Sequence, residues 1–246
     1  MCYNIALLQN KWNRLEKRYG KKKITIQPEP EEPSFFVSGF DHPEIPVISE
    51  KGITMASWGL IPRWCKTETD AQSIRQRTLN AMSETAADKP SFREAWQHNR
   101  CIIPVSGFYE WHQFAGKKYP IFIQRRETEI FSLAGLISEW KNPKNENSIL
   151  TCSILTTPAN ALMSIIHNTK KRMPFILDEA AENIWMEQGM NTAEIAMNIN
   201  YEMKFKLTLC SQRLNQNNIK RNHSWAIQGV EYPELVFSEL AGLIEE

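Results

Sequence analysis

Apolar residues recur at helical spacing near the start of the chain. Between residues 7 and 19, four apolar side chains fall on one face of a helix, and most of the residues between them are polar or charged; the four are Leu8, Trp12, Leu15 and Tyr19. This spacing predicts an amphipathic helix over 7–19 with a basic outer face.

Prolines and one serine mark where the next predicted elements begin or end. The run 28–34 (PEPEEPS) is incompatible with a helix, so we expect a linker across the surface. The segment 52–64 (GITMASWGLIPRW) is predicted to be a strand that runs into a proline turn. In 91–97 (SFREAWQ), Ser91 and Glu94 have the spacing of a capping box, which predicts the start of a short helix.

Strand signals dominate the middle of the chain. Four runs are rich in β-branched and aromatic residues, namely 101–112, 119–124, 130–140 and 148–157. The segments 114–118 (FAGKK) and 142–148 (NPKNENS) are typical of turns, so we expect hairpins. Beyond two predicted helices, at 179–188 and 192–200, the alternation in 204–209 predicts another strand. The whole pattern favours one α+β domain over 1–246, with an antiparallel, β-barrel-like sheet as its core.

Composition indicates an ordinary globular protein. The 246 residues are 42% hydrophobic and 23% charged, and the five cysteines include no CxxC spacing, so neither a disulfide framework nor a zinc module is predicted. No segment reaches the ~18 consecutive apolar residues of a membrane helix, and no signal peptide is apparent, so we expect a cytoplasmic, reducing environment. Cys101 and Cys152 lie in apolar runs and are interpreted as inert core thiols.

Charge is unevenly distributed although the net charge is only +1. The segment 11–23 contains seven bases and one acid, 203–230 contains five bases and no acid, and the end of the chain is acidic. A basic face can bind nucleic acid even when the total charge is near zero. Solvated helix and loop surface is the alternative interpretation.

Cys2 carries chemistry that no internal cysteine has. Methionine is commonly trimmed before a small residue, and removal of Met1 would give Cys2 a free α-amine beside its thiol. The amine titrates near ~7.7–8.0 and the thiol near ~8.5, so a useful fraction of each is nucleophilic at neutral pH. The amine can condense with an aldehyde, and the thiol can then close a thiazolidine ring. Two alternatives stay open: the nucleophile of an N-terminal hydrolase, or an ordinary thiol at a mobile end.

Three further polar residues stand out from their neighbours. Glu110 lies among aromatic residues in SGFYEWH, where burial would raise its pKa and suit it to proton transfer; a solvent-facing strand position is the alternative. His167 precedes three bases and is either an acid–base catalyst or a surface histidine. Asn80, in RTLNAMSET, is suited to orienting a nucleophile or a sugar hydroxyl, or to a turn or cap.

Seven short segments occur in a fixed order along the chain. They are MC at the start, WGLIPRW (58–64), LNAMSET (79–85), KPSFREAW (89–96), CIIPVSGFYEWH (101–112), SILTTPAN (153–160) and IHNTKKRMPFIL (166–177). Together they resemble the SRAP family, abasic-site processing proteins once labelled SOS response-associated peptidases. The resemblance covers about residues 2–227 and leaves an acidic tail at 231–246. It implies a single α+β domain with a β-barrel-like core and a basic cleft for single-stranded DNA.

The resemblance also implies roles for individual residues. Cys2 would cross-link to the ring-opened aldehyde of an abasic site, Glu110 would manage the protons of Schiff-base formation, and His167 would protonate the sugar oxygen to open the ring. Asn80 would hold the Cys2 end. Six residues are expected on the DNA side: Trp58, Trp64, Thr156, Lys170, Lys171 and Arg172.

The expected partner is single-stranded DNA with abasic sites. We expect it to be bound by a monomer that is associated with the nucleoid during DNA damage. The implied reaction needs no metal, no organic cofactor and no membrane.

The chain departs from the family pattern at two expected arginines. Asn4 stands in MCYN and Met82 in NAMSET where arginines are common, and the family's asparagine–proline segment is not clear in FFVSGFDHPEIP (35–46). Each lost phosphate contact lowers the salt slope by roughly one unit or less, so weaker DNA binding is predicted unless 170–172 or 11–23 compensates.

Three hypotheses follow from the sequence. The first is covalent capture of abasic sites, the second an N-terminal-cysteine peptidase or hydrolase, and the third a non-catalytic module that binds single-stranded DNA. Replacing Cys2 with alanine separates them, because the first loses cross-linking but keeps DNA binding, the second loses hydrolysis, and the third loses nothing.

Overall fold

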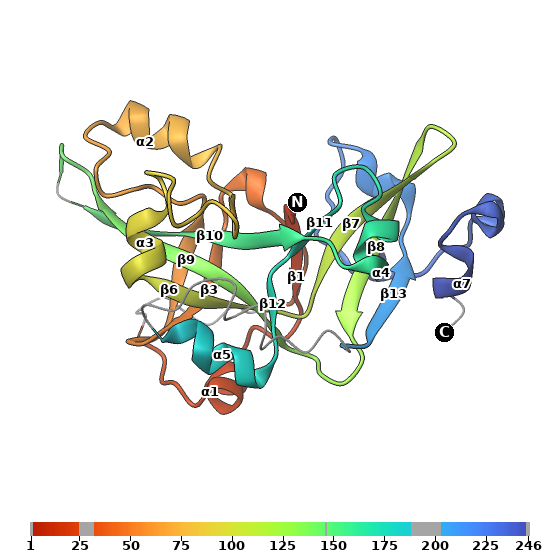
Figure 1. Cartoon of the computed structure of the whole chain (residues 1–246), viewed down its shortest axis with the longest axis horizontal. Helices are drawn as coiled ribbons and strands as arrows, with labels where there is room; N and C mark the ends of the chain where they lie inside the picture. The colour runs from red at the N-terminus through yellow and green to blue at the C-terminus, as the bar shows by residue number, and fades with distance from the viewer. Residues whose placement is uncertain (1, 25–31, 146, 188–202, 245–246) are drawn as a thin grey trace.

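A closed ring of five strands forms the core of the protein. The computed structural model describes residues 2–24, 32–145, 147–187 and 203–244 (Figure 1). The ring runs β10–β4–β3–β6–β9 and closes because β9 also pairs with β10. Its strands are β3 (Glu44–Ser49), β4 (Gly52–Trp58), β6 (Arg100–Val105), β9 (Phe131–Lys141) and β10 (Ser148–Pro158). The predicted α+β fold with a barrel-like core is confirmed, and most neighbouring strands are antiparallel, although β10 runs parallel to β4.

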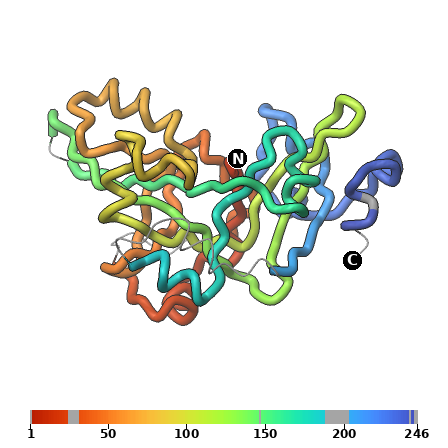
Figure 2. The backbone as a smooth tube through the Cα atoms, viewed as in Figure 1, coloured from red at the N-terminus to blue at the C-terminus, as the bar shows by residue number. Residues whose placement is uncertain are grey.

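A second sheet lies against the barrel and is antiparallel throughout. Its order is β13–β8–β7–β1–β2, with β1 (Asn4–Leu7), β2 (Ser34–Ser38), β7 (Gly107–Phe114), β8 (Lys117–Arg125) and β13 (Phe205–Leu209). One apolar cluster contains residues of both sheets, including Ile5 and Phe108 of the second sheet and Ile103 and Ile154 of the barrel. The amino terminus lies in the middle of the molecule, where the two sheets meet (Figures 1 and 2).

Short elements complete the barrel and cover its outside. The short strands are β5 (Asn80–Met82), which pairs in parallel with β10, together with β11 (Arg172–Pro174) and β12 (Ile176–Leu177). The α-helices are α1 (Trp12–Tyr19), α2 (Glu68–Arg75), α3 (Arg93–His98), α4 (Ala161–Ile166), α5 (Glu179–Met186) and α7 (Ala241–Ile244). The 3-10 turns are η1 (Gly39–Asp41), η2 (Gln212–Asn215), η3 (Ser224–Ile227) and η4 (Pro233–Phe237). A separate apolar cluster joins α1, α3 and α5 to the barrel strands.

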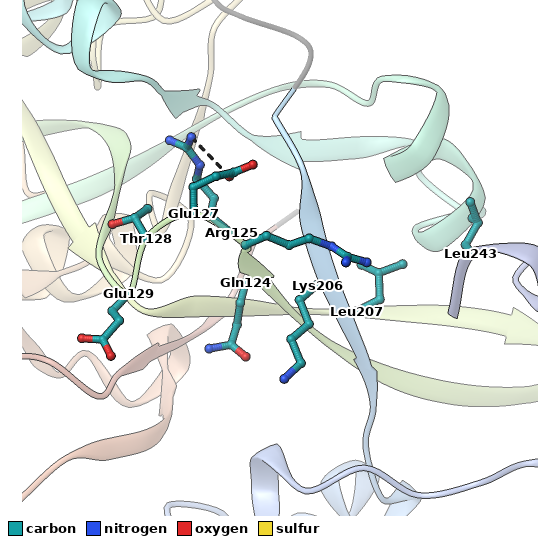
Figure 3. A pocket seen from close by; sticks show the side chains of 9 residues that line it. Gln124, Arg125, Glu127, Thr128, Glu129, Lys206, Leu207 and Leu243 are labelled. Carbon is teal, nitrogen blue, oxygen red and sulfur yellow. Dashed lines mark ion pairs between the residues drawn. The ribbon is translucent and has the colours of Figure 1, made fainter. Parts of the chain in front are cut away.

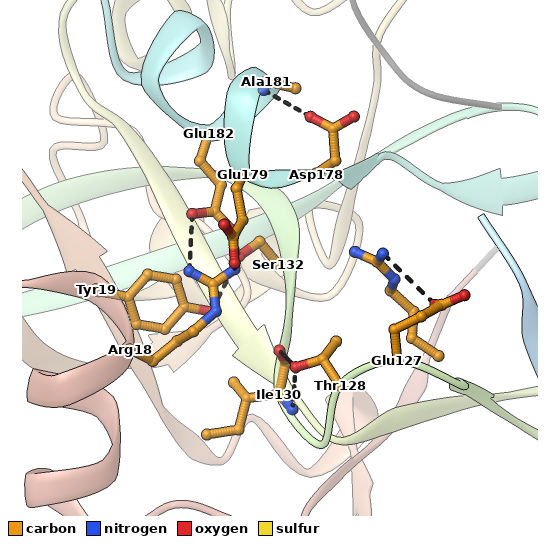
Figure 4. A network of polar contacts seen from close by, with 11 residues as sticks. Arg18, Tyr19, Glu127, Thr128, Ile130, Ser132, Asp178, Glu179, Ala181 and Glu182 are labelled. Atoms are coloured by element: carbon orange, nitrogen blue, oxygen red, sulfur yellow. Dashed lines mark hydrogen bonds and ion pairs between the residues drawn. The ribbon is translucent and has the colours of Figure 1, made fainter. Parts of the chain in front are cut away.

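A polar network locks α1 and α5 onto β9. Arg18 donates to both carboxylate oxygens of Glu182, at 3.2 and 2.6 Å, and Ser132 Oγ lies 2.5 Å from Glu182 Oε1 (Figure 4). The Tyr19 hydroxyl lies 2.9 Å from the same Ser132 oxygen. Since all these groups are partly or wholly removed from water, their mutual satisfaction is needed for the helices to pack here.

Several local predictions need correction. The helix expected over 7–19 begins only at Trp12, because Asn4–Leu7 is a strand. The capping box is wrong: the N-cap of α3 is Phe92, without a side-chain cap, and Glu94 instead pairs with Arg63. The run 101–112 is two strands, which are interrupted at 106.

Other local predictions are confirmed. The predicted hairpins appear as β7–β8 and β9–β10, and the helix predicted over 179–188 and the strand predicted over 204–209 appear as α5 and β13. The helix expected at 192–200 and most of the linker at 28–34 fall outside the described residues. Leu235 and Leu240, in the segment expected to be an acidic tail, are buried in the main apolar cluster.

Candidate active site at the amino terminus

Hydrogen bonding fixes the start of the chain in the second sheet. In β1, Asn4 pairs with Ser38 on one side and Ile5 with Phe108 on the other. The ladder continues beyond the strand, because the Gly39 backbone N–H donates to the Tyr3 carbonyl oxygen at 2.8 Å. Cys2 therefore belongs to the packed core, where it has no exposed surface. The interpretation of Cys2 as an ordinary thiol at a mobile end does not hold in this structure.

The thiol of Cys2 is held in its neutral form. Burial raises the pKa of this thiol far above its usual range, and the nearby charge of Glu110 raises it further. A thiolate is the reactive nucleophile in cysteine chemistry, so Cys2 needs a base to take its proton when it attacks. The dependence on Glu110 also indicates that the two side chains lie within electrostatic range.

Glu110 is a buried carboxylic acid in β7. Only 2% of its surface is exposed, and it pairs with Ile121 of β8. Burial raises its pKa to about 8, and the positive charge of the chain's amino terminus offsets part of that rise. The solvent-facing alternative is therefore wrong. A carboxyl group with this pKa is partly protonated and partly ionised near neutral pH, which is the requirement for a group that both gives and takes protons.

His167 follows α4 and lies against Glu110. Its Nδ1 is 3.3 Å from Glu110 Oε2 and 3.0 Å from the Arg172 carbonyl oxygen. Burial lowers the pKa of His167, and the positive charges of the amino terminus and Lys170 lower it further. The imidazole is therefore neutral at physiological pH. An Nδ1–H satisfies the carbonyl oxygen and places the lone pair of the neutral ring on Nε2, which is the nitrogen that can accept a proton.

Asn80 begins β5 and has an unsatisfied side chain. Its Cα pairs with Ile154 of β10, and the preceding Leu79 packs in the same apolar cluster as Cys2. Both the nitrogen and the oxygen of its amide are buried, and among the residues that the structure describes neither has a hydrogen-bond partner. A buried amide without partners is costly, so this arrangement is typical of a group kept ready for a ligand.

Arg172 is not a free surface cation. Its guanidinium bonds to Thr156 through the carbonyl oxygen at 2.8 Å and the hydroxyl at 3.2 Å, and to both carboxylate oxygens of Glu84 at 2.5 and 2.9 Å. Thr156 has no exposed surface, so it supports Arg172 rather than forming part of the surface. Thr156 also lies in register with Met82, which means that the Arg172 charge reaches the strand position beside Met82.

The other residues predicted on the DNA side separate into buried and exposed groups. Trp58 is fully buried, and its indole N–H donates to the Leu79 carbonyl oxygen at 2.8 Å; its burial is incompatible with direct stacking on a base in this structure. Trp64 is 51% exposed and is anchored by a bond from its indole N–H to the Pro90 carbonyl oxygen. Lys170 and Lys171 are exposed in the loop between α4 and β11.

Sequence reasoning missed Glu84, Tyr3 and Phe40. Glu84 lies in LNAMSET, but its ion pair spans 88 positions to Arg172, and no local pattern announces such a contact. Tyr3 follows Cys2 directly, so its position next to the reactive residue was available from the sequence. Phe40 lies in the 35–46 segment that departs from the family pattern, and nothing in its spacing distinguishes it from a core residue.

A pocket of about 610 Å³ lies at the junction of β8 and β13, away from these residues. Its charged side chains diverge: Arg125 is 3.7 Å from Glu127, whereas Lys206 points away from that pair (Figure 3). This pocket does not concentrate charge on one ligand. Within the described ranges, no three metal-ligating side chains gather at one point, and no helix combines the length and apolar character needed to cross a membrane.

Comparison with known proteins supports one assignment. The chain is 42% identical over 130 residues to the abasic site processing protein YoqW of Bacillus subtilis, a match that covers 52% of this chain and 54% of YoqW. It is 32% identical over 160 residues to the abasic site processing protein HMCES of Gallus gallus, covering 56% of this chain and 46% of HMCES. The chain thus spans about half the length of the curated relatives it matches.

Solved structures and a family model extend the match over most of the chain. A crystal structure of a Bacteroides thetaiotaomicron protein superposes with a TM-score of 0.82 and 31% identity, covering 94% of this chain and 100% of that one. The family model described as SOS response associated peptidase (SRAP) matches residues 1–217. The chain therefore belongs to the SRAP family.

Proposed function

We propose that this protein captures abasic sites in single-stranded DNA by forming a covalent thiazolidine through Cys2 after Met1 has been removed. The relatives named abasic site processing proteins support the substrate class. The observation that carries the chemistry is the contact between Glu110 and His167, two buried groups with opposite pKa shifts, of which Glu110 lies within electrostatic range of Cys2.

Glu110 can serve both halves of the reaction. The α-amine of Cys2 attacks the C1′ aldehyde and gives a carbinolamine. Protonated Glu110 then donates its proton to the carbinolamine hydroxyl, which leaves as water and gives the Schiff base. The resulting carboxylate takes the proton from the buried Cys2 thiol while the sulfur adds to the C=N carbon. The ring closes, Glu110 is protonated again, and the net change is loss of one water.

His167 and Asn80 act on the sugar and on the nucleophile. An abasic sugar is mostly a closed hemiacetal, and opening it requires a proton on the ring oxygen. His167 supplies this proton in its imidazolium form, which its lowered pKa makes a minor species at neutral pH. The buried Asn80 amide has no hydrogen-bond partner among the described residues, so it can bond to the amine or to a sugar oxygen during the reaction.

DNA is bound by a basic edge around β11. Lys170 and Lys171 are exposed beside His167, and Arg172 places its charge next to Met82, where the family pattern has an arginine. The 11–23 segment is a weaker candidate, since Arg14 pairs with Glu129 and Arg18 with Glu182. Trp64 provides an exposed aromatic surface for a base.

A trapping experiment tests this function and separates the amine from the thiol. Wild type and Cys2→Ala are incubated with an oligonucleotide containing one abasic site, with and without borohydride, and are then heated in denaturant. We expect a heat-stable adduct from wild type without reductant. Cys2→Ala retains an α-amine, so it should give an adduct only when borohydride reduces the Schiff base. A heat-stable adduct from Cys2→Ala without reductant would contradict the thiazolidine. Hydrolysis of a peptide without any DNA adduct would instead favour the peptidase hypothesis.

A further inference from the structure

Two aromatic rings, those of Tyr3 and Phe40, form a pair beside the reactive residue. Their centroids are 4.8 Å apart and their planes are inclined by 36°. Phe40 is 62% exposed, whereas Tyr3 is half-buried and directly follows Cys2. A large apolar side chain that stays in water next to a reactive group is unfavourable for solubility, and such exposure commonly marks a binding surface.

The turn that carries Phe40 is held in place by its backbone. Gly39 lies against the buried Trp58 indole, and a Cβ atom at Gly39 would be only 3.0 Å from that ring. The Trp58 backbone N–H donates to the Pro43 carbonyl oxygen at 2.8 Å, and His42 Nδ1 lies 2.7 Å from the Trp58 carbonyl oxygen. The exposed ring is thus presented by a fixed turn, and Trp58 supports that turn from below.

Strand pairing brings the start of η1 next to the start of the chain. Asn4 pairs with Ser38, and the bond from Gly39 to Tyr3 is the next step of the same ladder. The chain then turns through η1, which contains Phe40, and the Phe40 ring packs on the ring of Tyr3, the residue after Cys2. Burial raises the pKa of the Tyr3 phenol, and the charge of Glu110 raises it further. Tyr3 therefore lies near Glu110, the proposed proton donor. Tyr3 is therefore the member of the pair that lies near Cys2 and Glu110, and it carries the Phe40 ring beside it.

We propose that Tyr3 and Phe40 form a stacking platform for the nucleobase adjacent to the abasic nucleotide. This inference rests on the proposed function and specifies how that substrate is held. An abasic nucleotide lacks its own base, so the neighbouring base has lost a stacking partner and an aromatic side chain can replace it. Stacking is tolerant of sequence because every base has a π-face, and it fixes the strand while the sugar reaches Cys2.

The test uses an oligonucleotide that cannot react. A tetrahydrofuran abasic analogue lacks the aldehyde, and 2-aminopurine is placed immediately 5′ or 3′ of it to report stacking by fluorescence quenching. The variants are Phe40→Ala, Phe40→Leu and Phe40→Trp. Phe237→Ala is the matched control, because Phe237 is an 84% exposed phenylalanine in η4.

We expect wild type to quench one of the two reporter positions. Phe40→Ala and Phe40→Leu should lose that quenching and weaken binding by roughly 5–150-fold, the range that loss of one stacked base gives. Phe40→Trp and Phe237→Ala should resemble wild type. Melting temperatures verify folding, and Phe40→Leu keeps an apolar side chain of similar size, so a loss there reports the ring.

Wild-type affinity and quenching in both Phe40→Ala and Phe40→Leu would overturn the platform. Adduct formation with a true abasic site is measured separately. An adduct from wild type with no effect of Phe40 would leave the proposed function standing and remove the platform. If Phe40→Ala and Phe40→Leu weakened binding of the analogue but wild type gave no adduct with a true abasic site, the platform would stand and the proposed function would fail.

Discussion

Glu110 Oε2 lies 3.3 Å from His167 Nδ1, and the contact joins two groups that are both neutral near pH 7. Burial raises the pKa of Glu110 to about 8 and lowers that of His167, so the pair is a carboxylic acid beside an imidazole for much of the time. An ordinary ion pair would fix both protons in place. This pair instead keeps a transferable proton next to Cys2, which the proposed ring closure requires.

The rate of adduct formation should have a narrow optimum in pH. The α-amine is nucleophilic above ~7.7–8.0, whereas Glu110 is an acid only below about 8. We therefore expect the rate to rise toward pH 8 as the amine loses its proton, and to fall above it as Glu110 ionises. Single-turnover cross-linking between pH 6 and 10 measures both limbs.

Glu110→Gln tests whether ionisation of Glu110 causes the fall in rate above pH 8. Glutamine cannot donate the proton that expels water, so the maximal rate should fall by roughly 10²–10⁴-fold and the decline above pH 8 should disappear. If the variant retains that decline, a different group controls it.

Asn80→Ala should separate stability from activity. The substitution removes a buried amide with no partner among the described residues, which relieves about 1–3 kcal/mol of desolvation cost and offsets the lost packing. We expect an unchanged or higher melting temperature together with slower adduct formation.

Asn160→Ala is the matched control for that stability claim. Asn160 caps α4 by accepting a bond from the Met163 backbone N–H, so its loss should cost about 1 kcal/mol. If Asn80→Ala destabilised the protein as much as Asn160→Ala, Asn80 would have a structural rather than a catalytic role.

Glu84→Gln should strengthen DNA binding. Glu84 neutralises Arg172 in the free protein, so removing its charge frees one cation for a phosphate. One added contact steepens the dependence of log K on log salt by about 0.7 for single strands. Fluorescence titration of a single-stranded oligonucleotide at several salt concentrations measures this slope.

Glu129→Gln makes the same change of net charge at another place. Its partner Arg14 lies on α1, and both side chains of that pair are exposed. We expect little change in the slope. Equal effects of Glu84→Gln and Glu129→Gln would mean that net charge alone, without Arg172, controls affinity.

Glu182→Ala should unfold more readily than wild type. The Arg18 side chain is 20% exposed and Glu182 is 10% exposed, so the substitution leaves a largely buried guanidinium without its bidentate partner. We expect a loss of about 2–3 kcal/mol in the free energy of unfolding, somewhat below the value for a fully buried pair. Glu129→Ala breaks the exposed pair of Glu129 with Arg14, which lies on α1 like Arg18. It should lower the free energy of unfolding by less than about 1 kcal/mol. Urea denaturation compares the two, and equal losses would contradict the role of burial.

The sequence allowed the chemistry to be predicted better than its surroundings. Glu110 could be selected because a carboxyl group among aromatic residues is unusual in a strand, and burial then determines its pKa. Cys2 could be selected because only a second residue can acquire an α-amine. The barrel was predictable in kind from β-branched runs and turns. Its closure was not, since the parallel pairing of β4 with β10 joins segments that share no local pattern.

Contacts between distant segments were beyond sequence reasoning. The bond between Arg172 and Glu84 depends on β5 and β11 both lying next to β10. Trp58 matched a DNA-side motif, but its burial shows that it supports a turn whose exposed ring is Phe40. The strand at Asn4–Leu7 replaced the start of the predicted helix because pairing with β2 and β7 outweighs the helical spacing of Leu8.

The most direct measurement of the central claim is the intact mass of the protein before and after incubation with a single-stranded oligonucleotide that contains one abasic site. Covalent capture predicts a free protein without Met1, and an adduct that weighs the sum of protein and oligonucleotide less one water. It also predicts that this species survives heating in wild type and is absent, without reductant, from Cys2→Ala. A protein that retains Met1, or one that has lost Met1 but gives no adduct, would contradict the proposed chemistry.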